Sequence, residues 1–186
     1  MSKKTFPQRP KIPRALAAQE TVLPEDHAEF SNAKLTPNWI DATAQNIVIE
    51  EAALQRGLLT SAKLPKLRLR DVRVDGSDLS AAHLGQAHLL RVEIHSSRLL
   101  GTQFLDADLN DVLFKDCNLD GAVFASVRGK HLRFENCQLK NAAFESAAFE
   151  HITFSHCDLQ QASFFNTKLK HADLRGSKID GMQIAP

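Results

Sequence analysis

Three side chains capable of metal binding or disulfide chemistry recur at a spacing of twenty residues: Cys117, Cys137 and Cys157. Thiolates bind soft metal ions, and adjacent thiols can oxidise to a disulfide. Each cysteine, however, occupies a position that small residues such as Ser97 and Ser177 fill elsewhere, and free cysteine behaves as a small hydrophobe. We interpret the three as a buried structural column. An odd number of cysteines without metal-site spacing is also typical of a reducing compartment, so we expect a cytoplasmic protein.

Three imidazoles show the same spacing: His131, His151 and His171. Histidine binds metal ions and titrates near its ordinary pKa of about 6.5. Three ligands in one straight row do not converge on a tetrahedral ion, so we interpret this set as a solvated corner and leave its function open. The sequence therefore predicts no metal and no cofactor.

Both spacings are multiples of five, and a five-residue period runs through most of the chain. Large apolar residues recur at every fifth position from Ile49 to Ile184, and Gly129 alone interrupts this series of 28 positions. A second series of mostly small residues lies two positions before each large one. Neither a helical period of 3.6 nor a strand period of 2 can hold that register. Each five-residue unit is thus expected to bury one large and one small side chain.

This pattern resembles the pentapeptide-repeat family, whose loose consensus is Ala-Asp/Asn-Leu-X-X. Residues 107–111 (ADLND) and 172–176 (ADLRG) match that consensus directly. The resemblance implies an all-β fold, a right-handed quadrilateral β-helix in which four units form one coil. Residues 47–186 would then make about seven coils of twenty residues. Residues 28–46 are expected to form an irregular cap or first coil, and residues 1–27 a flexible basic, proline-containing arm.

A period of twenty is visible beneath the period of five, because residue types sort into columns. If the coils are square, residues twenty apart stack on one another, and each wall should have its own character. The predicted core columns are Leu119, Leu139 and Leu159; Phe104, Phe124, Phe144 and Phe164; Phe114, Phe134 and Phe154; and the three cysteines.

The charges are balanced, with 23 basic and 22 acidic residues. No global field therefore indicates a nucleic-acid partner, and aromatic residues for base stacking do not accompany the basic positions. No run of residues approaches the length of a membrane span. Gly-rich phosphate loops and catalytic Ser/His/Asp patterns are also missing, so we do not expect an enzyme.

One predicted wall is apolar on its outside as well as its inside. Its outward positions include Leu105, Val123, Ala125, Ala143 and Phe165. Exposed apolar patches often mark protein-binding or dimer surfaces. We therefore expect a non-catalytic scaffold that acts through protein–protein interaction with an unknown partner, and this wall is the candidate surface. The protein could alternatively form a homodimer, through this wall or through the C-terminal coil.

The family resemblance implies an alternative. Some pentapeptide-repeat proteins bind DNA gyrase as acidic mimics of DNA and protect this topoisomerase from quinolones or from a gyrase toxin. The neutral surface expected here disfavours that activity. A third hypothesis is that the protein regulates an enzyme through its basic N-terminal arm.

Overall fold

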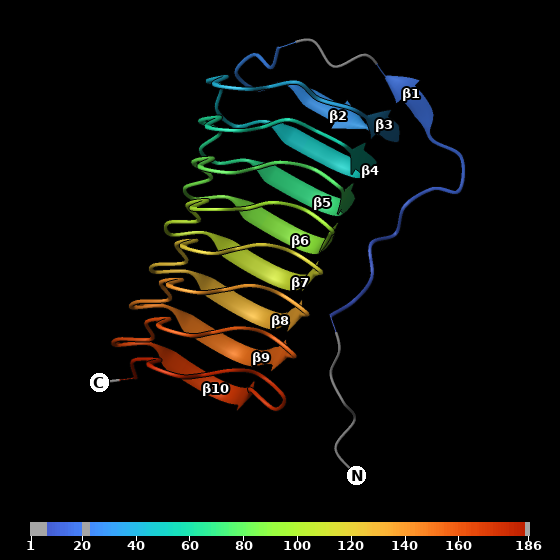
Figure 1. The fold of residues 1–186 in the computed structure, drawn as a ribbon. Coiled ribbons are helices and arrows are strands. Elements are labelled where there is room, and N and C mark those ends of the chain that lie inside the picture. The colour runs from blue at the N-terminus through green and yellow to red at the C-terminus, as the bar shows by residue number, and fades with distance from the viewer. Residues whose placement is uncertain (1–6, 20–22, 185–186) are drawn as a thin grey trace.

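The computed structural model describes residues 7–19 and 23–184. These residues contain a parallel β-solenoid of about eight turns and no helix (Figure 1). None of these residues therefore lies in a helix that is long and apolar enough to span a membrane. The predicted all-β, right-handed quadrilateral β-helix is confirmed.

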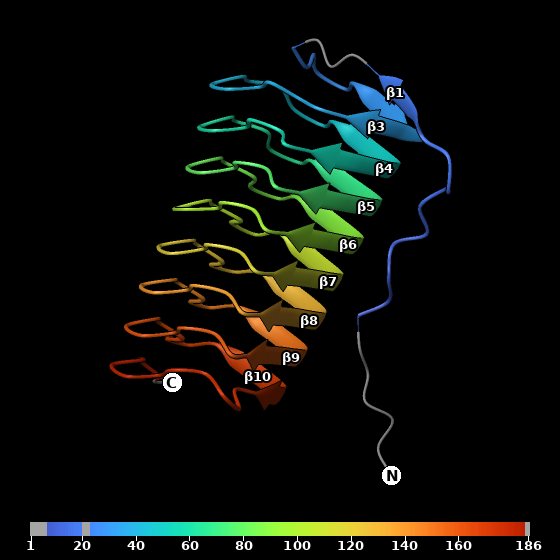
Figure 2. The ribbon, with the colours of Figure 1, turned by 45° about the vertical axis from the view of Figure 1, so that its right-hand side comes forward.

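One long parallel sheet runs through the stack in the order β1-β3-β4-β5-β6-β7-β8-β9-β10, and β2 pairs with β4. The strands are β1 (Ala17–Gln19), β2 (Glu29–Ser31), β3 (Ala33–Leu35), β4 (Val48–Gln55), β5 (Arg68–Asp75), β6 (His88–His95), β7 (Asp108–Lys115), β8 (Arg128–Glu135), β9 (Ala148–Ser155) and β10 (Lys168–Asp173). Each of β4 to β9 bends around one corner of the solenoid and so contributes to two walls, as Figure 2 shows. The other two walls are held by isolated bridges between residues twenty apart, such as Val123 with Ala143.

The register explains why equal residue types form columns. From β4 onward the paired residues of neighbouring coils are twenty positions apart, for example Leu69 and Leu89. The first turn is one residue shorter, because Phe30 pairs with Ile49 and Leu35 with Leu54. Its large side chains, Phe30, Leu35 and Trp39, are buried like those of the regular coils.

The corners have a common backbone conformation. From Asp41 to Gly181 every fifth residue has a positive φ, between 46° and 79°. Asparagine, aspartate and glycine tolerate this left-handed conformation best, and several corners have these residue types. Because the turn recurs every five residues, the two side chains on the apolar positions of each unit always face inward.

The phenylalanine columns fill the interior of the C-terminal half. Within one column the rings of Phe104 and Phe124 stack with centroids 5.0 Å apart, and Phe124 stacks on Phe144 at the same distance. Rings of the second column meet them edge-on, such as Phe134, whose centroid lies 5.8 Å from that of Phe124. Offset-stacked and edge-on pairs are the favoured aromatic geometries. The seven column rings, Phe104, Phe114, Phe124, Phe134, Phe144, Phe154 and Phe164, are all buried.

The interruption at Gly129 leaves no hole. A β-carbon at this position would lie 2.7 Å from Phe149 Cδ1 and 2.8 Å from Leu132 Cδ1. The ring of Phe149, from the next coil, thus occupies the volume that a large residue at 129 would need, and it is itself buried.

The N-terminal arm lies against the side of the stack. Residues 7–16 run along the solenoid in the direction opposite to the growth of the coils, and β1 pairs with β3 at the first turn (Figures 1 and 2). The flexibility expected for this arm stays a prediction.

Candidate interaction surface

The wall outside the Phe104–Phe164 column contains the five predicted apolar residues, which we call the apolar wall: Leu105, Val123, Ala125, Ala143 and Phe165. Leu105 and Phe165 are 41% and 53% exposed, whereas Val123, Ala125 and Ala143 are half-buried. Val123 bridges directly to Ala143, so these two side chains are neighbours on adjacent coils. The fold therefore places all five on one wall, although their role in binding stays a prediction.

The same wall also has a carboxylate that is not among the five predicted residues. The backbone hydrogen bonds of successive coils place Glu145 between Ala125 and Phe165 in one outward column. Its Oε1 accepts a hydrogen bond from the Ser163 hydroxyl at 3.0 Å. Phe165 is thus separated from the rest of the apolar wall by one polar pair. Counting outward positions twenty residues apart would have found this glutamate.

The strand corner is the column of left-handed residues in the middle of the long strands: Glu51, Asp71, Arg91, Asp111, His131, His151 and His171. Arg91 donates two hydrogen bonds to Asp71, from Nε to Oδ1 and from Nη2 to Oδ2, both at 2.6 Å. His131 Nδ1 lies 3.1 Å from Asp111 Oδ1. The buried Asp71 carboxylate has a lowered pKa, chiefly because the Arg91 guanidinium stabilises its charged form, and the Lys11 amide adds to this.

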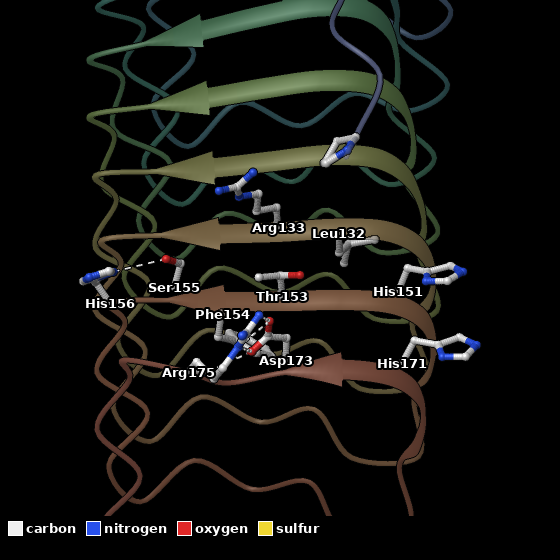
Figure 3. A pocket seen from close by; sticks show the side chains of 11 residues that line it. Leu132, Arg133, His151, Thr153, Phe154, Ser155, His156, His171, Asp173 and Arg175 are labelled. Carbon is white, nitrogen blue, oxygen red and sulfur yellow. Dashed lines mark hydrogen bonds and ion pairs between the residues drawn. The ribbon is translucent and has the colours of Figure 1, made fainter. Parts of the chain in front are cut away.

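The three histidines predicted at this corner do form a stack. The rings of His131 and His151 are 5.3 Å apart, and those of His151 and His171 are 4.6 Å apart. Figure 3 shows His151 and His171 pointing outward on the same side, at the edge of a hollow that Asp173 and Arg175 also line. Within residues 7–19 and 23–184, no group of histidine, cysteine, aspartate or glutamate has the geometry to hold a metal ion.

The stack changes the acidity of its middle ring. Loss of hydration is the main reason that the pKa of His151 lies below its ordinary value, and repulsion from protonated His171 and His131 lowers it further. The carboxylate of Glu150 opposes this effect, whereas Lys130 adds to it. Proton uptake by His151 is therefore less favourable than by an ordinary imidazole.

We call the two walls to which β4 to β9 contribute the strand walls. Most charged side chains on these walls are paired with the residue twenty positions away. Arg128 binds both carboxylate oxygens of Asp108, at 2.7 and 3.0 Å, and Lys170 Nζ lies 3.0 Å from Glu150 Oε1. Arg70 likewise binds Glu50 on the preceding coil. These pairs between adjacent coils reduce the field of the basic positions locally.

The three cysteines lie inside the solenoid as free thiols. Each thiol donates to backbone carbonyls; that of Cys137, for example, lies 3.4 Å from Phe114 O. The neighbouring thiols of Cys117 and Cys157, together with burial, raise the pKa of Cys137. A thiolate, the reactive form of cysteine, is thus disfavoured at the centre of the column.

The family model for the pentapeptide repeat region matches residues 107–184, and a search of characterised proteins found no significant match. HetL, a pentapeptide repeat protein involved in heterocyst differentiation regulation from the cyanobacterium Nostoc sp. strain PCC 7120, is 18% identical, with 84% of this chain and 83% of HetL covered and a TM-score of 0.44. A trypsin-treated variant of QnrB1, a plasmid-mediated fluoroquinolone resistance protein, is 19% identical, with coverages of 90% and 91% and a TM-score of 0.46.

Pentapeptide repeat proteins are generally non-catalytic scaffolds. The matched repeat region begins in the middle of the solenoid, and coils of the same twenty-residue register continue upstream of it to β4. Residues 107–184 are thus a pentapeptide repeat region, and the coils before them share its twenty-residue register.

Proposed function

We propose that this protein is a non-catalytic cytoplasmic scaffold that binds a protein partner through the apolar wall. The observation that carries the proposal is an exposed leucine and an exposed phenylalanine, Leu105 and Phe165, on one straight wall with three smaller apolar residues between them. A rigid wall of this kind can bury large side chains of a partner without rearranging its own backbone, which lowers the entropic cost of association.

The apolar wall differs from the strand walls in its charge. The strand walls present paired arginine, lysine and carboxylate side chains, which a partner would have to dehydrate. The apolar wall has one carboxylate among its five apolar residues, and that carboxylate is already hydrogen-bonded to Ser163. Association at this wall therefore removes apolar surface from water with less loss of polar hydration.

The test introduces charge into the wall. The double variant Val123→Glu/Phe165→Glu should lose binding to its partner or to a second copy, measured by pull-down and by sedimentation velocity. The matched control is Leu90→Glu/Leu100→Glu, because these leucines are 37% and 38% exposed and lie on neighbouring walls. If the folded wall variant associates as well as the control does, the proposal is wrong.

The alternative of gyrase protection is weakened by the pairing of charges along the columns, since a mimic of DNA needs a continuous negative surface. Gyrase supercoiling in the presence of a quinolone tests it directly. Protection by the purified protein would replace the scaffold proposal with this one.

A further inference from the structure

The N-terminal arm is attached to the strand corner through its backbone. The N–H of Lys11 donates to Asp71 Oδ1 at 2.9 Å, and the N–H of Gln8 donates to Asp111 Oδ1 at 3.0 Å. The side chains of Gln8 and Lys11 are exposed. The corner therefore binds the main chain of the arm, and these two side chains contribute little to the attachment.

The arm has a regular sequence at this place. Pro7, Pro10 and Pro13 recur every three residues, and all three are half-buried against the solenoid. Proline fixes φ near −65° and favours the polyproline II conformation, which has three residues per turn. Each of the two donating amides belongs to the residue that follows a proline, so the same side of the extended chain faces the corner at every turn.

The periods of the two structures match. Three residues of polyproline II advance about 9.3 Å, and two coils of the solenoid, each about 4.8 Å high, advance about 9.6 Å. Asp71 and Asp111 are two coils apart, and the amides that they accept are three residues apart. Between the two carboxylates, Arg91 holds Asp71 in place through two hydrogen bonds.

We propose that Asp71 and Asp111 form a binding track for extended segments that have a proline at every third residue and a free N–H on the residue after each proline. Residues 7–13 occupy this track in cis and thereby control access to it. The fitting ligand is a proline-rich basic peptide, because carboxylates line the track and Arg9 of the arm also lies 4.0 Å from Glu93. This site is separate from the apolar wall, and the proposal does not depend on the function assigned there.

The first variant removes the two donors while keeping the arm extended. In the full chain, Gln8→Pro/Lys11→Pro deletes both N–H groups, and Gln8→Ala/Lys11→Ala is the control because it removes the same side chains but keeps both donors. Tryptic cleavage after Arg14 should be at least tenfold faster in the proline variant than in the alanine variant. Equal cleavage rates would overturn the assignment of the two amides.

The second measurement tests recognition in trans. A fluorescein-labelled peptide with the sequence of residues 7–14 should bind the proline variant at least tenfold more tightly than it binds the alanine variant, as measured by fluorescence anisotropy. The same peptide carrying Gln8→Pro and Lys11→Pro should bind at least tenfold more weakly. If the unmodified peptide does not bind, or binds all proteins equally, no such track exists.

A matched pair of corner substitutions locates the site. Added to the proline variant, Asp111→Ser should abolish binding of the peptide, whereas Asp116→Ser should leave it unchanged. Asp116 is an aspartate with the same left-handed backbone, φ 54° in both cases, at a different corner, where it binds Asn136. Equal effects of the two substitutions would show that the peptide responds to net charge alone, which would overturn the proposal.

Discussion

Adding a β-carbon at Gly129, the single interruption of the repeat, should destabilise the protein. In the variant Gly129→Ala the new β-carbon would lie 2.7 Å from Phe149 Cδ1 and 2.8 Å from Leu132 Cδ1, where carbon atoms normally keep about 3.5–4.0 Å. Both neighbours are buried, with exposures of 3% and 1%, and the Phe149 ring packs edge-on against Phe144 at 6.1 Å. Neither side chain can therefore move away freely.

The expected magnitude follows from two opposing terms. Overpacking of a core costs about 1–3 kcal/mol, and replacing a glycine stabilises by about 0.4–1 kcal/mol through the unfolded chain. The free energy of unfolding should accordingly fall by about 1–2 kcal/mol in Gly129→Ala. Phe149→Leu should be destabilising in the wild-type background but should relieve the alanine variant, which gives a favourable coupling of about 1 kcal/mol.

Urea unfolding of the four proteins, followed by circular dichroism, measures this cycle. Fluorescence of Trp39, the only tryptophan, reports on the first turn, and coincident transitions would establish that the solenoid unfolds as one unit. A Gly129→Ala protein that is as stable as the wild type, or a coupling free energy of zero, would refute the packing described at Gly129.

Three further predictions concern the interior and the histidine stack. Phe124→Leu loses two stacked and two edge-on ring pairs, whereas Phe164→Leu loses one of each. The free energy of unfolding, measured in urea, should therefore fall by about 1–3 kcal/mol more in Phe124→Leu than in Phe164→Leu. Equal losses would contradict the ring geometry. Because the pKa of His151 lies below its unfolded value of about 6.5, the unfolded chain takes up the proton first, and stability should fall as the pH drops below roughly 6.5. In His151→Gln the melting temperature should depend less on pH between pH 7 and pH 5 than it does in the wild type. An unchanged pH dependence would contradict this prediction. Cys137 should resist a thiol reagent in the native state and react after denaturation, and rapid native labelling would exclude its burial.

The repeat and its columns could be predicted from the sequence because they rest on burial alone. A large apolar side chain at every fifth position, as in Leu119 and Phe124, indicates that each five-residue unit buries one large side chain, and the family resemblance implied that four units make one coil. The stacking of Phe104 on Phe124 follows directly, since identical residues twenty apart must meet.

Other features depend on contacts that no local pattern contains. The position of the arm is set by Asp71 and Asp111, which lie 60 and 103 residues from their partners. The proline period at 7, 10 and 13 was visible in the sequence, but its match to two coils requires the height of a coil. The volume at Gly129 was likewise undetermined, because whether a neighbouring ring turns into a gap depends on packing, which spacing does not determine.

The attachment of the arm also changes how the rod should come apart. In a solenoid each coil touches only the coils above and below it, so unfolding can begin at an end and spread coil by coil. The arm pairs with β3 at the first turn and also binds Asp71 and Asp111, so it connects coils that have no contact of their own. Because of this attachment, unfolding of the first turn and unfolding of the middle coils are coupled. The solenoid therefore unfolds cooperatively over a greater length than contacts between neighbouring coils alone would provide.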